Sequence, residues 1–461
     1  MKNKIIQNSI IIYTLLVGIL FTSASCTSQI EVDMPNDKID QSEVYKDVAT
    51  TKAVLNNIYL NFSSSYIFSK SNAGPSFNLS LFTDELDYYG TNIYSNDMYE
   101  NSITDNNSYI SSWWNDSYQS IYTINAFIEG VKNSTYLDND LKKQFLGEAY
   151  TLRALNYHYL TILFGDVPYT VSTDYNHNKS LKRLPYQEVL QKVESDLISA
   201  VEILDYSYRD PNKFYINKST ALVILVENYI AQKKYDKAET TARLLLDQKT
   251  YSIENDLSKT FKKDANSTIW QIPPKFTTDI TSEASLYLFS NFTLNSSVIT
   301  GNLLALFQDK DKRKKEWLNK ITLNNEDFYQ VYKYKNQQNN TDEFSIFYRI
   351  EQVYFHLAYS LSMQNNVKQA IETLNIVRQK RGLEDLSTSL SKQEFITNYL
   401  EESTREFFTE NGRRFIDLKI TNKLDDLKIS KPNFKSYHNL MPIPYRQLEI
   451  NKNLLPNNPG Y

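Results

Sequence analysis

Residues 147–169, GEAYTLRALNYHYLTILFGDVPY, form the stretch of sequence that decides the fold. Across residues 138–164 apolar side chains recur every three or four positions, which is the spacing of one face of an α-helix. We expect this helix to end at Gly165, because glycine readily adopts the left-handed conformation that follows many helices. Pro168 comes directly afterwards and cannot continue a helix. A long helix with a marked end is therefore the first predicted element.

Helical spacing returns on both sides of this segment. Upstream it covers residues 42–62, with Ser42 as the predicted N-cap, and it resumes at Trp113. Downstream it covers residues 186–205 and 392–420. These periodic segments predict a chain built mainly from packed helices.

Three segments lack a clear helical period. Residues 63–112 are rich in Ser, Asn, Asp and Tyr and predict long loops. Residues 260–345 predict a loop-rich lobe with short strands in the runs STIWQI and DFYQVYKYK. Residues 438–461 contain several prolines and predict an extended tail that is too polar to form a domain.

Two segments, residues 222–246 and 354–377, share one pattern of apolar and small residues. In each, a first helix is followed by a second helix that carries alanines where two antiparallel helices would cross. This pattern is typical of tetratricopeptide repeats, although any pair of packed helices gives similar spacing. The matching positions of the second helices are Tyr235, Ala238, Ala242 and Leu245 in the first segment, and Val367, Ala370, Leu374 and Val377 in the other.

The composition supports a mostly helical fold and excludes some functions. Of 461 residues 41% are hydrophobic, enough for a large core, and the 10 glycines and 12 prolines are too few for a turn-rich all-β fold. The formal net charge is −4 and the basic residues are scattered, so we expect no nucleic-acid partner.

The N-terminus predicts export and a lipid anchor. Lys2 and Lys4 precede an apolar run, residues 10–21, which is shorter than the roughly 20 residues that span a bilayer. Cys26 follows small residues directly after this run and is the only cysteine, so it cannot form a disulfide within the chain. It resembles the acylated cysteine of a bacterial lipoprotein, although Ser23 is an unusual residue for that motif. The alternative is an incidental thiol in an ordinary signal peptide.

The titratable residues give no sign of catalysis or of a metal site. The four histidines, His158, His177, His356 and His438, have no partner at metal-ligand spacing, and we expect no cofactor. The richest ionic cluster lies within residues 401–417, where arginines alternate with carboxylates. Arginine lowers the pKa of a neighbouring carboxyl group, whereas a general acid needs a raised one. We therefore interpret this cluster as a structural ion network, as we do the pair Glu148 and Arg153, and expect no enzyme activity.

Tyrosine supplies the one candidate for ligand binding. The chain contains 35 tyrosines, and several lie among Asp and Asn in the polar segment 84–99. Aromatic rings cover the apolar C–H faces of sugars, while Asn, Asp and Arg bind their hydroxyl groups. Tyrosine and asparagine are equally common in protein-binding loops, so the pattern does not choose between a glycan and a peptide.

Four stretches in a fixed order resemble the SusD/RagB family, the surface nutrient-binding lipoproteins of Bacteroidetes. They are residues 147–169, 348–383, 405–419 and 441–461. The sequence departs from the family pattern at Tyr359, Asn411 and Asn457. The first stretch matches the family signature with Glu148, Ala149, Leu152, Arg153, Ala154, Gly165 and Pro168.

The resemblance implies a mostly α fold, a SusD-like α-α superhelix of tetratricopeptide-like helix pairs with a loop-rich lobe and a few short strands. It divides the chain into a signal peptide (1–25), a polar tether (26–42), an N-terminal region (43–230) and a C-terminal region (231–461) of one compact domain. It implies a lipoprotein at the surface of the outer membrane and a SusC-like TonB-dependent transporter as partner. The ligand would be a glycan or, in some members, a peptide.

The resemblance does not transfer ligand-binding residues, because these lie in variable loops of the family. Position and residue type suggest two regions, 84–99 and 270–292. The other open alternative is a periplasmic tetratricopeptide adaptor that binds only proteins. The predicted ligand-binding residues are Asp84, Tyr88, Tyr89, Tyr94, Asn96, Trp270, Tyr287 and Phe292, with Cys26 as the lipid anchor.

Overall fold

The computed structural model describes residues 44–272, 276 and 278–461. Residues Tyr45–Tyr461 form one compact unit. The predicted signal peptide, the tether and Cys26 lie outside the described residues. Within the described part, no helix combines the length and apolarity that a membrane crossing requires.

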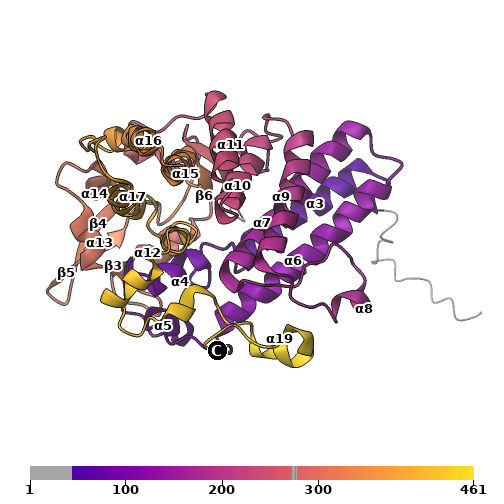
Figure 1. The fold of residues 1–461 in the computed structure, drawn as a ribbon, viewed down its shortest axis with the longest axis horizontal. Coiled ribbons are helices and arrows are strands. Elements are labelled where there is room, and N and C mark those ends of the chain that lie inside the picture. The colour runs from indigo at the N-terminus through magenta and orange to yellow at the C-terminus, as the bar shows by residue number, and fades with distance from the viewer. Residues whose placement is uncertain (1–43, 273–275, 277) are drawn as a thin grey trace, which may run out of the picture. The chain divides into compact units, whose positions relative to one another are not determined.

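The N-terminal half is a series of long helices packed side by side, as Figure 1 shows for α3, α6, α7 and α9. The helix α7 confirms the prediction from residues 138–164, and Gly165 ends it with φ 75°. Its whole second half is buried, so it forms the centre of this layer. The helices of this half are α3 (Val48–Ser64), α4 (Pro75–Phe82), α5 (Ile93–Tyr99), α6 (Ser108–Asn133), α7 (Asn139–Phe164), α8 (Tyr175–Asn178) and α9 (Tyr186–Ile203).

The two predicted tetratricopeptide-like pairs are antiparallel helix hairpins. The first consists of α10 (Lys218–Ala231) and α11 (Tyr235–Asp247), and the second of α15 (Ile350–Met363) and α16 (Val367–Lys380). The pairs stack on each other through α11 and α15. The alanines predicted at the helix crossings are fully buried, which allows the helices to approach closely: Ala238, Ala242 and Ala370.

The predicted mixed lobe contains three two-stranded antiparallel sheets and short helices. The sheets pair β1 (Leu86–Tyr88) with β3 (Ser297–Ile299), β2 (Thr268–Ile272) with β6 (Ser345–Arg349), and β4 (Leu318–Leu323) with β5 (Glu326–Val331). The short helical elements are η1 (Leu257–Lys259), α12 (Ser282–Tyr287), α13 (Gly301–Leu306) and α14 (Lys312–Glu316). The strand β1 joins the N-terminal half to this lobe, because its partner β3 lies more than 200 residues further along the chain.

Residues 63–112 are not the long loops that the composition predicted. They contain α4, α5, β1 and the start of α6, which begins at Ser108 rather than at Trp113. Asparagine itself starts two of these helices: Asn92 and Asn107 each accept two backbone N–H groups as N-caps. Likewise Asp47 caps α3, whereas Ser42, the predicted N-cap, lies outside the described residues.

The C-terminal segment is folded rather than extended. After α17 (Lys392–Phe407) and α18 (Arg413–Ile420), it forms η2 (Leu424–Ile429), η3 (Ser436–Asn439), α19 (Tyr445–Ile450) and η4 (Lys452–Leu454). Met441 and Ile443 are fully buried, and the Asn458 side chain donates to the carbonyl oxygens of Phe164 and Met441. These contacts tie the end of the chain to the end of α7.

The ionic cluster in residues 401–417 is a buried structural network, as predicted. Glu406 has no exposed surface and accepts hydrogen bonds from Arg313, Arg349 and Arg381. These arginines hold the pKa of Glu406 well below its usual value, although burial alone would raise it. Such a carboxyl group cannot supply a proton at neutral pH.

Glu148 and Arg153 are also structural, but they do not pair with each other. Glu148 binds Arg209 at 2.8 Å, and Arg153 binds Asp196 at 2.7 Å. The two residues are five positions apart on α7. Only residues three or four positions apart lie on the same face of a helix, so these two side chains reach different neighbours.

Candidate functional site

An aromatic platform lies where β1, the loop before β3 and the hairpin β4–β5 meet. We use this name for Tyr89, Phe292 and Phe328. The rings of Tyr89 and Phe292 are stacked, with centroids 4.9 Å apart and an interplanar angle of 9°. Phe328 meets both edge-on, at 5.3 Å and 5.5 Å. Although Tyr89 has two aromatic neighbours, 44% of its surface stays exposed to solvent.

The strands hold the platform in place. The Tyr89 amide donates to the Ser296 carbonyl at 2.9 Å and so extends the β1–β3 ladder by one pair. Side chains alternate along a strand, so Tyr88 and Tyr89 face opposite ways. Tyr88 packs on Phe77 and its hydroxyl donates to the Leu294 carbonyl, while the Tyr89 ring points to the other side and forms part of the platform. The ladder therefore fixes one wall of the platform through backbone bonds.

Next to the platform, asparagines and tyrosines form a hydrogen-bonded cluster. The Tyr109 hydroxyl accepts from Asn72 at 3.0 Å and from Asn92 at 2.8 Å, and Asn72 also donates to Asn295. The ring of Tyr94 packs edge-on against that of Tyr109 at 5.3 Å. Asn295 lies only three residues after Phe292, so the cluster and the platform share one segment of chain.

A polar cleft of about 390 Å³ opens beside this cluster. Its lining combines hydroxyl and amide groups with a single carboxylate and two aliphatic residues. The residues are Ser71, Asn72, Asp279, Ile280, Ser282, Ser285, Leu286 and Asn295. Uncharged donors and acceptors of this kind can bind hydroxyl groups in either direction.

The charge around the platform is negative. Partial burial, and then the carboxylates of Asp87 and Glu326, raise the pKa of the Tyr89 phenol, so it stays protonated at neutral pH. The nearest ion pair in the hairpin, Lys320 with Asp327, is neutral as a whole. The described surroundings of the platform therefore favour neutral ligands over anionic ones.

The structure brings together only some of the residues that the sequence suggested. Tyr89 and Phe292 form the platform, Tyr94 belongs to the neighbouring cluster, and Asn96 is exposed on α5. Asp84 instead binds Arg414 through two hydrogen bonds of 2.7 Å. Tyr88 packs beneath the platform.

Two of the predicted residues lie in the core. Trp270 is 1% exposed, and its indole N–H donates to the Phe214 carbonyl. Tyr287 is 2% exposed and packs on Phe77. Rings at these positions support the fold beneath the surface and present no face to a ligand in this conformation.

Other members of the candidate site carry no signal in the sequence. Phe328 lies in an alternating strand and is indistinguishable there from a core residue, and Asn72 and Asn295 are ordinary loop residues in the sequence. Their role depends on the pairing of β1 with β3, which joins segments that are far apart in the chain.

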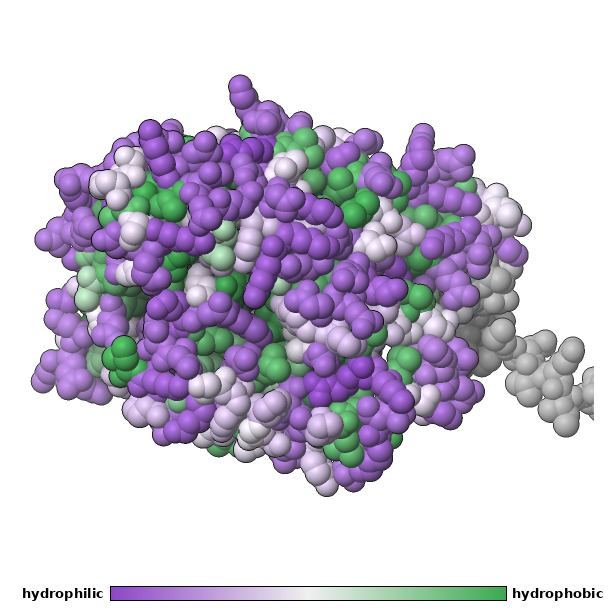
Figure 2. Space-filling view, viewed as in Figure 1, coloured by the Kyte–Doolittle hydropathy of each residue, from purple (hydrophilic) through white to green (hydrophobic). Residues whose placement is uncertain are grey.

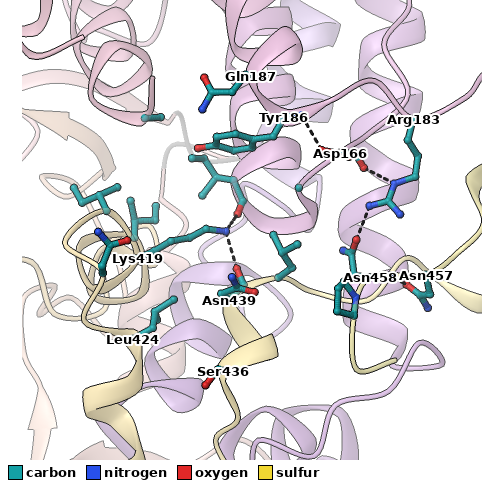
Figure 3. Close-up of a pocket in the computed structure, with 18 of the residues that line it drawn as sticks. Asp166, Arg183, Tyr186, Gln187, Lys419, Leu424, Ser436, Asn439, Asn457 and Asn458 are labelled. Atoms are coloured by element: carbon teal, nitrogen blue, oxygen red, sulfur yellow. Dashed lines mark hydrogen bonds between the residues drawn. The ribbon is translucent and has the colours of Figure 1, made fainter. Parts of the chain in front are cut away.

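A second concavity, of about 1010 Å³, is larger than the polar cleft. We call it the C-terminal cleft; Figure 3 shows it with Tyr186 and Gln187 on one side, Lys419 across it, and Leu424, Ser436 and Asn439 opposite. It shares no lining residue with the polar cleft. No group of histidine, cysteine or carboxylate side chains in the described residues could hold a metal ion.

Comparisons with known proteins agree on one family. A family model described as "Starch-binding associating with outer membrane" matches residues 32–230. SusD-like protein P2 of Formosa agariphila is 24% identical, over 96% of this chain and 98% of its own length.

Solved structures share the fold. A SusD superfamily protein from Bacteroides vulgatus superposes with a TM-score of 0.79 at 16% identity, covering 90% of this chain and all of that one. A structure described as a laminarin-binding SusD-like protein gives 0.77 at 18% identity, with the same coverage. These matches confirm the helical architecture that the sequence predicted.

Proposed function

We propose, from the premise that this chain belongs to the SusD/RagB family, that it binds neutral oligosaccharides and delivers them to a transporter in the outer membrane. The family is described as starch-binding and associated with the outer membrane, and one structural neighbour is described as laminarin-binding. The ligand of this chain belongs to the same broad class and binds at the aromatic platform.

The observation that carries the proposal is the stacked pair of Tyr89, which is exposed, and Phe292, which is half-buried. A flat aromatic surface covers the C–H face of a sugar ring, while the amides and hydroxyls of the neighbouring cleft can bind its hydroxyl groups. The β1–β3 ladder holds the platform in place before the ligand arrives, so little entropy is lost on binding.

The remaining parts of the proposal concern place and partner. We infer that Cys26 is acylated and holds the protein at the cell surface, with the acidic segment after it as tether. A SusC-like TonB-dependent transporter would receive the glycan. Modest affinity is sufficient, because the anchor and the partner raise the effective concentration of the bound ligand. The protein acts by binding, without catalysis.

Isothermal titration of the soluble protein, residues 27–461, against a ligand panel tests this function. The panel contains laminarin, maltoheptaose, the anionic polysaccharide alginate, and casein hydrolysate as a source of peptides. We expect binding of a neutral glycan and none of alginate. Binding of peptides alone would show that the ligand is a peptide and not a glycan. Binding of alginate alone would contradict the proposed preference for neutral over anionic glycans.

A further inference from the structure

The C-terminal cleft has a composition unlike that of the aromatic platform. The end of α7, the α10–α11 turn, α18 and the C-terminal segment enclose it. Its lining includes the rings of Tyr186 and Tyr235 and a larger set of aliphatic residues, among them Ile230, Ile416, Ile420, Leu424 and Leu440. Figure 2 shows hydrophobic residues recessed near the middle of a face that is otherwise mostly hydrophilic. The aliphatic side chains outnumber the two rings, and aliphatic side chains suit the branched side chains of a peptide, whereas sugar rings stack on aromatic faces.

The cleft also has an excess of positive charge. Four of its lining residues are cationic, Lys182, Arg183, Lys233 and Lys419, whereas two are acidic, Asp166 and Asp425. Asp425 already pairs with Lys428 at 3.0 Å, and Asp166 accepts the backbone N–H of Tyr186 at 2.8 Å.

Two of the cations are held by neutral oxygens. Lys419 donates to the carbonyl oxygens of Ile162 and Asn439, as the dashed lines in Figure 3 show. Arg183 donates to the carbonyl oxygens of Asp166 and Pro456 and to the Asn458 side chain. No described carboxylate lies within ion-pair distance of either group. Burial lowers the pKa of Lys419 to about 7, which is the expected cost of a desolvated cation without an anion nearby.

We propose that the C-terminal cleft binds an extended acidic segment of a partner protein. Side chains alternate along an extended chain, so aliphatic residues would lie on the floor while the carboxylates between them meet Arg183, Lys419 and the two rim lysines. The volume of about 1010 Å³ accommodates such a segment. The bound carboxylates would supply ion-pair partners for Arg183 and Lys419, which have none among the described carboxylates. This proposal is independent of glycan binding at the platform.

Fluorescence anisotropy with three labelled hexapeptides tests the proposal. Each alternates isoleucine with a second residue, which is glutamate, glutamine or lysine. The soluble protein, residues 27–461, should bind the glutamate peptide at least about tenfold more tightly than the other two. The double variant Lys182→Glu/Lys233→Glu changes only exposed rim residues, so it should fold normally and lose most of this affinity. Lys142→Glu, a change at a partly exposed residue at the other end of α7, should bind as the wild type does.

The position of the bound peptide on the protein provides a second measurement. The bound glutamate peptide should protect Lys182 and Lys233 from acetylation while Lys142 still reacts. Equal affinity for the three peptides, no measurable binding of any, or unchanged affinity of the double variant would each overturn the proposal. It would also fail if an acidic oligogalacturonate were bound there in preference to the glutamate peptide.

Discussion

Glu406 lies at the centre of a buried network in which carboxylates alternate with guanidinium groups. Three arginines bind it directly, and Arg313 continues the network to Asp311 and Glu402. The network joins α14, the start of α15, α16 and α17, which are separated in sequence. A carboxylate so placed holds the C-terminal helices to the strand lobe, because removing it leaves buried cations with one partner fewer.

We expect Glu406→Gln to destabilise the protein by about 3–5 kcal/mol, since it breaks a buried ion pair by changing one partner. Chemical denaturation of the soluble protein measures the loss. Glu401→Gln is the matched control, because Glu401 is largely exposed on the same helix and lies 4.0 Å from its nearest partner. Equal stability of both variants would contradict the structural role of Glu406.

The same network predicts a loss of stability in acid. Burial would raise the pKa of Glu402, but Arg313, Arg405 and Arg378 outweigh it and lower the pKa from 4.5 to about 2. Ionised Glu402 therefore contributes stability that is complete above pH 4.5 and is lost as the pH falls to about 2. The free energy of unfolding should decrease on the order of 3 kcal/mol across this range through this residue.

Denaturation of the wild type and of Glu402→Gln at a series of pH values below 4.5 separates this effect from that of Glu406 and Glu410, whose pKa values are also lowered. Glu227 and Glu283, whose pKa values burial raises to about 7, are protonated in the folded and the unfolded protein there. Between pH 4.5 and 7 these two residues act in the opposite direction, because only the folded protein keeps their protons. A Glu402→Gln variant should be less stable at pH 5 and should show a shallower acid dependence; an unchanged slope would refute the assignment.

Single residues of the proposed site were predictable only in part. Tyr89 and Phe292 lie in polar segments, so an exposed role could be inferred from their neighbours. Trp270 lies in the run TIWQI, all of which is buried, and that apolar context was a sign of a core position. The role of Phe328 could not be predicted from the sequence, because the pairing of β4 with β5 is what brings its ring to the platform.

At the scale of elements, Gly165 connects α7 to the segment that borders the C-terminal cleft. Its φ of 75° and ψ of −122° belong to a region that residues with a side chain rarely adopt. A β-carbon there would also lie 3.0 Å from Leu440. The sequence predicted this helix end because the glycine and the proline after it are local signals.

We expect Gly165→Ala to cost about 1–3 kcal/mol, since it forces a strained backbone and crowds Leu440. Thermal unfolding compares it with Gly301→Ala. Gly301 starts α13, has no atom within 4 Å of an added β-carbon, and should tolerate alanine with little change. If the two variants unfolded at the same temperature, the conformation at Gly165 would be less restrictive than its dihedral angles indicate.

Long helices were predictable and short ones were not, for a physical reason. In α7 and the two helix pairs, many turns repeat the same periodic signal. In residues 63–112, α4 and α5 contain 8 and 7 residues, and the aromatic residues of α4 pack against distant parts of the chain, as Phe77 does on Tyr287. The prediction of an extended C-terminal tail is wrong for a similar reason: the burial of this segment depends on contacts with α7 rather than on its own hydrophobicity.

At the scale of the whole molecule, the proposed lipid anchor and the proposed binding sites lie in different segments of the sequence. Cys26 lies outside the described residues, and the compact unit begins at Tyr45. We therefore expect Cys26→Ala to abolish retention in washed membranes while leaving ligand affinity unchanged in vitro. Fractionation of the cells followed by titration of the released protein measures both. Retention of the variant in membranes would show that something other than this cysteine holds the protein there.

Titration of laminarin and maltoheptaose into the wild type, Tyr89→Ala and Tyr122→Ala tests glycan capture at the aromatic platform most directly. Tyr122 is the matched control, because it is 52% exposed on α6 and lies outside the platform. We expect the wild type and Tyr122→Ala to bind at least one of the two glycans equally well. Tyr89→Ala should bind it about tenfold more weakly, a loss of about 1.4 kcal/mol. Equal affinity of Tyr89→Ala and the wild type would contradict capture at this platform.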